Sequence, residues 1–351
     1  MDAFLQEQFT AGQRILECVP NFSEGCDPKV IEAIASAISS VEGVKVLHVD
    51  PGAAANRTVV TFAGEPDAVV EAAFRGVRKA AELIDMRRQK GEHPRIGATD
   101  VLPLVPVRGI TLDEATGYAV RLAKRIFGEL GIPTYLYEAA ASRPERRKLE
   151  YNRRGEWEGL REKISTEEGR PDFGPTRWTP EAERAGATIV GARDYLIAVN
   201  FNLDTVSARI AGEIAGDIRE SGRVAGEAGD GKQRLPGSLK GVKAIGWYIA
   251  EYGFAQVSVN ITDIPSSPLN KVFDEVREKA AGRGVNVTGT EIIGLVPESV
   301  LVDAGRYFAA QGGVPGDLSD EELISGAIDA MGLSQIKPFD PREKVIEYLL
   351  R

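Results

Sequence analysis

The apolar residues of this chain change repeatedly between two spacings, and this alternation constrains the fold more than any other feature. VKVLHVDPG (44–52) has the alternating pattern of a strand, whereas Val30, Ile34 and Ile38 share one face of a helix that Asp27 would cap. Both halves of the 351-residue chain repeat this change. The pattern predicts an α/β (α+β) protein of two subdomains, each with a mixed sheet and outer helices.

The character of the sequence changes between Arg143 and Arg170, where both signs of charge are dense and apolar periodicity is weak. We interpret this stretch as a solvated, partly helical connector. It runs into PDFGPTRWTP, in which three prolines disfavour regular structure. We therefore predict subdomains over 14–170 and 171–351, preceded by a flexible extension over 1–13.

Composition narrows the class of protein. A net charge of −9 disfavours a nucleic-acid partner, whose phosphates need a basic surface. There is no apolar run of about 20 residues and no basic segment at the start of the chain, so neither a membrane span nor a secretory signal is predicted. No pattern of metal ligands is found. We expect a cytoplasmic protein without a metal, whose ligands are small molecules.

RRQKGEHPRIGATD (87–100) contains His93, one of only two histidines. The proline after His93 favours extended backbone, and Gly91 and Gly97 allow close turns around it. A histidine titrates near neutral pH, and the basic residues on either side of it can hold carboxylates. His93 is therefore a candidate catalytic residue; the alternative is an exposed histidine in a charged turn.

Two further candidates lie at strand ends, where α/β proteins often place functional side chains. Asp50 ends one strand before Pro51 and Gly52, and its alternative role is turn formation. Arg57 begins the next strand, and could either hold a carboxylate or simply solvate a sheet edge.

Several long segments of the chain resemble glutamate formiminotransferase, a folate-dependent enzyme of histidine breakdown. They are ECVPNFSEG (17–25), VDPGAAANRTVVTFAGEP (49–66), LIDMRRQKGEHPRIGATDVLPLVPVRGIT (83–111), PDFGP (171–175), KAIGWYIAE (243–251), EIIGLVP (291–297) and PFDPREKVIEYL (338–349). The resemblance runs from Arg14 to the C-terminus. Animal members carry an additional cyclodeaminase domain, and cyclodeaminase activity is not expected here.

The resemblance implies two stacked sheets with a folate-binding crevice between the subdomains, and a homodimer. It also implies that His93 is catalytic and that tetrahydrofolate is the co-substrate. The residues that it assigns to folate or substrate binding, beside Asp50 and Arg57, are Asp172, Phe173, Gly174, Pro175, Thr176, Arg177, Trp178, Thr179, Pro180, Ala215, Gly216 and Asp217.

The implied reaction moves the formimino group of N-formimino-L-glutamate to tetrahydrofolate, with His93 acting first as general base and then as general acid. Two alternatives remain open. The enzyme could instead move a formyl group from 5-formyltetrahydrofolate to glutamate, or the chain could bind folate without catalysis.

Overall fold

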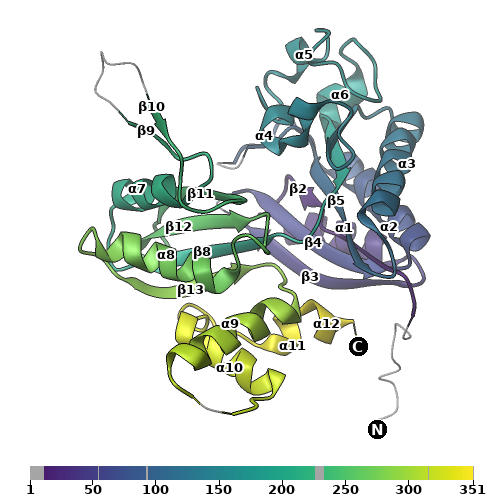
Figure 1. Ribbon diagram of the computed structural model, residues 1–351. Coiled ribbons are helices and arrows are strands. Elements are labelled where there is room, and N and C mark those ends of the chain that lie inside the picture. The colour runs from purple at the N-terminus through teal and green to yellow at the C-terminus, as the bar shows by residue number, and fades with distance from the viewer. Residues whose placement is uncertain (1–11, 54, 92–93, 226–232, 315, 351) are drawn as a thin grey trace. The chain divides into compact units, whose positions relative to one another are not determined.

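The computed structural model describes residues 12–53, 55–91, 94–225, 233–314 and 316–350. They form two compact units, one ending at Asp194 and the other beginning at Tyr195 (Figure 1). Both units combine helices with a sheet, so the predicted α/β class is confirmed. The predicted stacking of the two sheets, and the crevice between them, stay predictions.

The first unit is built on a seven-stranded mixed sheet. Its strands are β1 (Ile15–Cys18), β2 (Asn21–Phe22), β3 (Val44–Gly52), β4 (Arg57–Gly64), β5 (Thr99–Arg108), β6 (Thr134–Glu138) and β7 (Thr188–Ala192). β1 and β2 follow one another between β4 and β5, since Pro20 lacks the N–H that a continuous strand would need. β7 is parallel to both β5 and β6, and the other pairs are antiparallel.

Three long helices cover one face of this sheet (Figure 1). They are α1 (Pro28–Ser39), α2 (Pro66–Leu83) and α3 (Leu112–Leu130). Their start signals were readable in the sequence: Asp27 accepts a hydrogen bond from the N–H of Lys29, and Thr111 and Glu114 form a reciprocal capping box. Each helix turns its apolar stripe toward the sheet and so buries it.

The segment predicted to be a solvated connector packs on the opposite face of the sheet. It forms a 3₁₀ turn (Pro144–Arg147), α4 (Leu149–Asn152) and α5 (Leu160–Lys163). Leu160 and Ile164 are fully buried against Tyr135 and Ile189 of β6 and β7. The prediction was wrong for these positions, because isolated apolar residues in one-turn helices have no periodicity to read.

The boundary between the units also differs from the predicted division at residue 170. Residues 171–194 lie in the first unit, because β7 inserts beside β5 and β6 and because α6 (Pro180–Ala185) precedes it. The consecutive strands β7 and β8 (Ile197–Leu203) therefore belong to different units, and β7 completes the sheet of the first.

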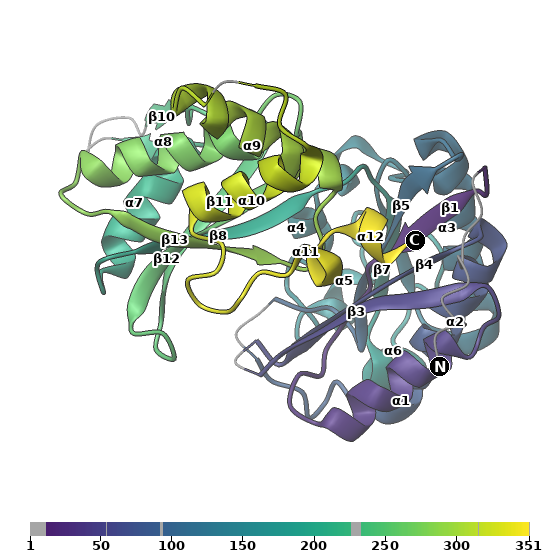
Figure 2. The same ribbon diagram turned by 90° about the horizontal axis from the view of Figure 1, so that it is seen from below.

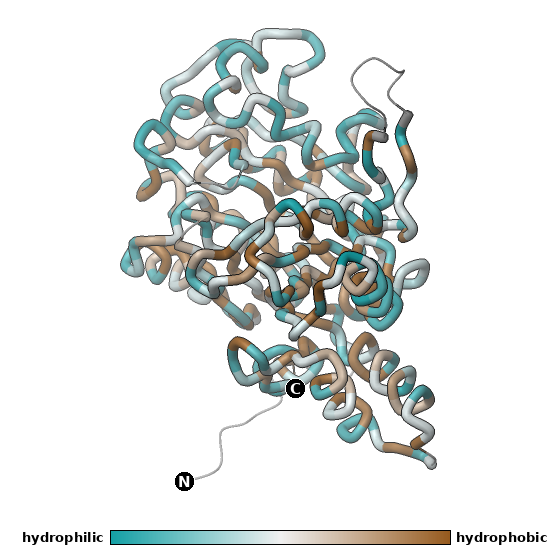
Figure 3. The backbone as a smooth tube through the Cα atoms, turned by 90° about the vertical axis from the view of Figure 1, so that its left-hand side faces the viewer, coloured by the Kyte–Doolittle hydropathy of each residue, from teal (hydrophilic) through white to brown (hydrophobic). Residues whose placement is uncertain are grey.

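The second unit has a four-stranded antiparallel sheet in the order β11-β12-β8-β13. Its strands are β8 (Ile197–Leu203), β11 (Val242–Ile249), β12 (Phe254–Ile261) and β13 (Val287–Ile293). α7 (Ala208–Ile218) and α8 (Leu269–Ala281) pack on one face, where Phe201 and Val272 join the core. In Figure 3 apolar and polar segments alternate along the chain, as such one-sided burial requires.

A short strand pair and the helices of the tail complete this unit, and the tail adds Leu301 and Ile324 to the core. The strands β9 (Arg223–Ala225) and β10 (Gln233–Leu235) form a short antiparallel pair. The tail forms α9 (Glu298–Gln311), α10 (Asp320–Met331), α11 (Pro341–Lys344) and α12 (Ile346–Leu349). α9 packs against α8 and α10 (Figure 2).

α7 begins at Ala208, although Asp204 is also a residue type that caps helices. Ser207 accepts the capping hydrogen bond, from the N–H of Ile210 at 3.3 Å. Asp204 instead accepts hydrogen bonds from the backbone N–H (2.6 Å) and side-chain amide (2.7 Å) of Asn286. The two candidate caps lie three residues apart, so only the tertiary contact of Asp204 with the following strand distinguishes them.

The helices of the described ranges include none long and apolar enough to cross a membrane. The predicted N-terminal extension lies almost wholly outside the described residues, which begin at Gly12.

Candidate functional site

The strand ends that carry Asp50 and Arg57 are paired neighbours in the first unit. Gly52 of β3 lies opposite Arg57 of β4, and Asp50 lies opposite Val59. Burial, the largest cause, lowers the pKa of Arg57 to about 10. The charge of Asp50 acts in the opposite direction. Arg57 is therefore a partly buried cation at neutral pH, with Asp50 as one of its countercharges.

Two residues that the sequence did not single out complete this cluster. Asp100, in β5, is 1% exposed and accepts a hydrogen bond from Ile96 N–H at 2.9 Å. Arg153, at the end of α4, donates to the same carboxylate through Nε (3.0 Å) and Nη2. The charges of Asp100 and Arg153 both act on Arg57. Arg153 was missed because it lies in the segment taken for a solvated connector.

His93 itself lies outside the described residues, and its predicted catalytic role stays a prediction. The chain on either side is described. Gly91 packs so closely on the β3–β4 loop that a Cβ there would lie 2.4 Å from the carbonyl oxygen of Ala55. Only glycine fits this approach.

Two of the basic residues near His93 are already paired with acidic side chains. Arg87 donates to both oxygens of Asp85, at 2.8 and 2.6 Å. Arg95 is only 8% exposed and forms ion pairs with Glu156 (3.4 Å) and Glu158 (3.1 Å). The sequence predicted that the basic residues around His93 can hold a substrate carboxylate. In the structure Arg87 and Arg95 instead bind carboxylates of the protein itself.

The predicted folate-contacting loop is anchored by Asp172. Its carboxylate accepts hydrogen bonds from the N–H of Leu136 (2.8 Å), the hydroxyl of Ser142 and the guanidinium of Arg146 (2.7 Å). Arg146, 2% exposed, also donates to the carbonyl of Arg170 at 2.6 Å. Asp172 thus holds the base of the loop against β6.

The remaining residues of this loop differ in their exposure. Thr176 and Arg177 are exposed, whereas Trp178 packs against the core beneath β6 and β7. Thr179 caps α6 by accepting from Ala182 N–H, and Pro180 is the first residue of that helix. The other three members of the predicted set, Phe173, Gly174 and Pro175, are half-buried. A rigid base therefore carries an exposed tip at Thr176 and Arg177.

The second predicted folate segment belongs to α7, in the second unit. Ala215 and Gly216 are buried. Asp217 forms ion pairs with Arg223 (2.6 Å) and with Arg283. The structure brings Asp50 and Arg57 together within the first unit, but each unit is described by itself, so a meeting of this segment with them is not tested.

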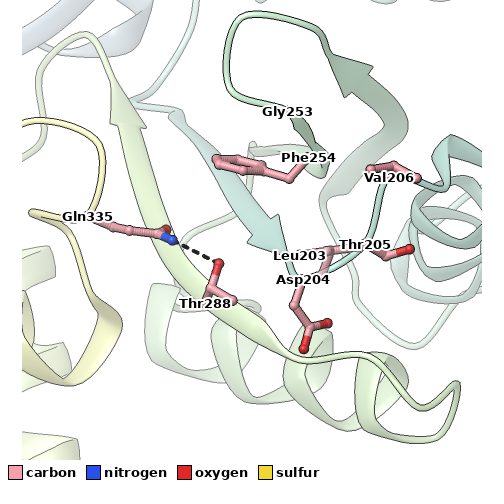
Figure 4. A pocket seen from close by; sticks show the side chains of 8 residues that line it. All are labelled: Leu203, Asp204, Thr205, Val206, Gly253, Phe254, Thr288 and Gln335. Carbon is pink, nitrogen blue, oxygen red and sulfur yellow. Dashed lines mark hydrogen bonds between the residues drawn. The ribbon is translucent and has the colours of Figure 1, made fainter.

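The second unit also contains a hollow of about 580 Å³ that the sequence did not predict (Figure 4). It is lined by Leu203, Asp204, Thr205, Val206, Gly253, Phe254, Thr288 and Gln335. Of the predicted site residues that the structure describes, none lines it.

A chain of neutral hydrogen bonds leads to this hollow across the sheet. Trp247 donates to Gln256 (3.1 Å), and Gln256 donates to Asn202 (2.7 Å). Asn202 donates to Gln335 (2.7 Å), which donates to Thr288 (2.9 Å; Figure 4). We call these five residues the amide chain.

The described part of the protein includes no group of three His, Cys, Asp or Glu side chains arranged to hold a metal ion. The expectation of a metal-free enzyme is not tested by this finding.

Comparisons with known proteins cover both units. A model described as the formiminotransferase domain, N-terminal subdomain, matches residues 15–193, and one described as the formiminotransferase domain matches residues 198–351. The two matches meet where the two compact units meet.

Curated relatives extend this similarity. The chain is 45% identical over 338 residues to formimidoyltransferase-cyclodeaminase of Gallus gallus, covering 96% of this chain and 60% of that protein. It is 42% identical over 295 residues to glutamate formimidoyltransferase of Streptococcus pyogenes serotype M1, covering 84% and 93%. For the glutamate formimidoyltransferase of Thermoplasma acidophilum the identity is 41% over 296 residues, covering 84% and 92%. The chain thus spans about 60% of the length of the animal relative and most of the two microbial ones.

Proposed function

Since the chain belongs to the formiminotransferase family, we propose that it transfers the formimino group of N-formimino-L-glutamate to tetrahydrofolate, in histidine degradation. The products are glutamate and 5-formiminotetrahydrofolate. The similarity to two microbial glutamate formimidoyltransferases, over most of their length and most of this chain, carries this proposal.

The chemistry requires two proton movements. The five-position nitrogen of tetrahydrofolate bonds to the formimino carbon and loses a proton, and the glutamate nitrogen gains a proton as its bond to that carbon breaks. One imidazole can accept the first proton and deliver the second. We assign both steps to His93, whose ordinary pKa of about 6.5 suits both directions near neutral pH.

Both substrates carry carboxylates, and Arg57 is the group that we assign to one carboxylate of formiminoglutamate. It is cationic, partly buried, and starts a strand whose pairing with β3 fixes its place. Arg57→Gln is expected to raise the KM for formiminoglutamate about 10- to 100-fold, the usual effect of losing a hydrogen bond to a charged group. An unchanged KM in steady-state kinetics would remove Arg57 from substrate binding.

Folate contacts are assigned to the loop from Asp172 to Pro180 and to Ala215–Asp217 of α7. The exposure of Thr176 and Arg177 supports a contact at the tip of the loop. Asp172 acts indirectly in this assignment, because its carboxylate oxygens already bind Leu136, Ser142 and Arg146. A cytoplasmic homodimer, with tetrahydrofolate as co-substrate and no metal, completes the proposal.

The test is an assay of the purified chain with formiminoglutamate and tetrahydrofolate, following the 5-formimino product. A parallel assay supplies 5-formyltetrahydrofolate and glutamate, and calorimetry measures tetrahydrofolate binding. Faster turnover of the formimino donor supports the proposal. Preference for the formyl donor, or tight folate binding without turnover of either donor, contradicts it.

A further inference from the structure

We propose that Asn56, Gln89 and Glu24 form a hydrogen-bonded clamp that positions the chain leading into His93 relative to Arg57. This inference rests on the proposed function, because it treats the three residues as positioning groups for the two proposed functional side chains. None of the three is assigned to substrate binding. They come from three loops that follow β2, β3 and α2.

Asn56 is the centre of the clamp. Its Oδ1 accepts a hydrogen bond from Gly25 N–H at 2.9 Å. Its Nδ2 donates to the Lys90 carbonyl at 2.8 Å and to Gln89 Oε1 at 2.6 Å. A backbone N–H can only donate and a backbone carbonyl can only accept, so these partners fix which way the Asn56 amide points.

The backbone of Asn56 is also specialised. Its φ of +45° lies in the left-handed region, which asparagine tolerates better than most residues. Arg57 follows it directly at the start of β4. The side chain that holds Gln89 and Lys90 is therefore one residue from the proposed carboxylate ligand.

Gln89 links Asn56 to Glu24, and the orientation of its amide follows from that of Asn56. Because Gln89 Oε1 faces Asn56, its Nε2 faces Glu24 and donates to Oε2 at 3.0 Å. The other oxygen of Glu24 accepts the backbone N–H groups of Cys26 (2.8 Å) and Asp27 (2.9 Å). Glu24 is 8% exposed, so little water can replace the hydrogen bond that Gln89 donates to it.

The three loops lie backbone against backbone where the clamp joins them. A Cβ on Gly25 would lie 2.4 Å from the carbonyl oxygen of Gly52 and 2.5 Å from the N of Arg57. Gly91 meets Ala55 equally closely. No side chain lies between these loops at the two glycines. A change in the orientation of an amide in the clamp is therefore expected to shift the loop backbones.

The chain that follows His93 is also held by hydrogen bonds. Arg95 Nη2 donates to the Gln89 carbonyl at 2.7 Å, and Trp157 N–H donates to the Arg95 carbonyl at 3.0 Å. Gln89 and Arg95 are thus joined directly to each other by a hydrogen bond. The clamp joins Gln89 in turn to Asn56, which directly precedes β4.

The experiment reverses the direction of the hydrogen bonds. Asn56→Asp replaces the donor that faces Gln89 by an acceptor, and Glu24→Gln replaces the acceptor that faces Gln89 by a donor. Each single change leaves Gln89 with one mismatched partner whichever way its amide points. In the double variant a reversed Gln89 amide matches both partners, and the total charge is that of the native protein. At the Lys90 carbonyl the native hydrogen bond stays lost, and a carboxylate oxygen of residue 56 faces the carbonyl oxygen instead.

Two readouts are expected to follow this pattern. Each single variant should lower kcat about 10-fold, since small misplacements of reacting groups cost rate steeply, and the double variant should recover to within about 3-fold of the native kcat. The KM for tetrahydrofolate should stay within about 2-fold in all three. The chain has only two histidines, so imidazole NMR spectra can follow His93 directly, with His48 as the internal reference. The His93 signal and its titration should move in both single variants and return in the double variant.

Asn270→Asp, the same chemical change near the start of α8, is the matched control and should alter neither readout. Thermal unfolding of every variant shows whether it is folded. The clamp is overturned if both single variants keep kcat within 2-fold and an unmoved His93 signal. It is also overturned if a folded double variant recovers in neither readout. Absence of transferase activity in the native chain would contradict the proposed function alone, because the imidazole spectra still decide whether the clamp exists.

Discussion

The loops of the first unit and the sheet of the second hold their polar side chains in place by different means. The clamp in the first unit is hydrogen-bonded to the backbones of two loops, through Gly25, Cys26 and Asp27 in one and Lys90 in the other. The amide chain in the second unit instead follows the register of its strands. Trp247 lies opposite Gln256, and Gln256 lies opposite Asn202.

The loss of one side-chain hydrogen bond is therefore expected to have different consequences in the two regions. On a strand the ladder places each side chain, and one amide can be lost without moving the backbone. In a loop the side chain itself sets the backbone position, so a lost bond moves the chain. Arg57, the proposed carboxylate ligand, begins β4 directly after one of these loops. We therefore expect changes in the first unit to affect turnover most, and changes in the second unit to affect stability.

The largest expected effect is that of His93→Ala. Loss of a positioned proton shuttle should lower kcat about 10²- to 10⁴-fold, while tetrahydrofolate binding measured by calorimetry stays within a few-fold. His48→Gln, the same kind of loss within β3, is the control and should keep most of the turnover. A kcat of the His93→Ala variant within a few-fold of the native value would show that His93 is not the proton shuttle.

Arg146→Met tests the charged anchor of the folate loop. It leaves the carboxylate of Asp172, whose side chain is 9% exposed, without its ion-pair partner. Removing one member of a buried pair should lower the free energy of unfolding by about 3–5 kcal/mol in urea titrations. Arg121→Met breaks the exposed pair with Asp67 and should cost below about 1 kcal/mol. Equal losses in the two variants would show that burial of the first pair does not matter.

Gly289→Ala tests the amide chain. A Cβ at Gly289 would lie 2.1 Å from Oε1 of Gln335, so Gln335 must leave and give up its bonds to Asn202 and Thr288. We expect a loss of about 1–3 kcal/mol in the free energy of unfolding, with kcat little changed. Gly326→Ala, in α10 and with open space around it, should stabilise by about 0.5–1 kcal/mol. A kcat that falls more than about 10-fold in a folded Gly289→Ala protein would break the distinction between the two regions.

A further effect concerns pH. Burial, the first cause, lowers the pKa of Lys163 to about 8, and the nearby charges of Arg146 and Arg154 act in the same direction. The unfolded lysine has a pKa of about 10.4, so the unfolded state binds more protons between these values. The free energy of unfolding contributed by this group should therefore rise as the pH rises from about 8 to about 10.4. Urea titrations across this range should show the rise in the native protein and lose it in Lys163→Met; an identical slope in both would contradict the assignment.

The helices could be read from the sequence wherever local signals define them. Asp27 before Pro28 and the Thr111–Glu114 box mark helix starts because their hydrogen bonds join residues two or three positions apart. The hairpin of β11 and β12 was also readable, because its two strands follow one another along the chain and Ile249 lies opposite Phe254. The start of α7 was not, because Asp204 is bound by Asn286, a partner 82 residues away.

The candidate site was readable in part. Residue type and loop context singled out His93, Asp50 and Arg57, and the structure confirms only that the last two lie together. Arg153 and Asp100 were missed. Their pairing spans 53 residues of chain, and no spacing in the sequence records it.

By itself the sequence determined the α/β class, most helix starts and the family, because each depends on local periodicity or on long matching segments. The tertiary structure alone decided that β7 belongs to the first sheet, that the charged connector covers a core, and that Glu24, Asn56 and Gln89 meet. These outcomes depend on which apolar surfaces, far apart in the sequence, are buried against each other. They also depend on which buried polar groups then form hydrogen bonds with one another. Neither condition leaves a local pattern in the chain.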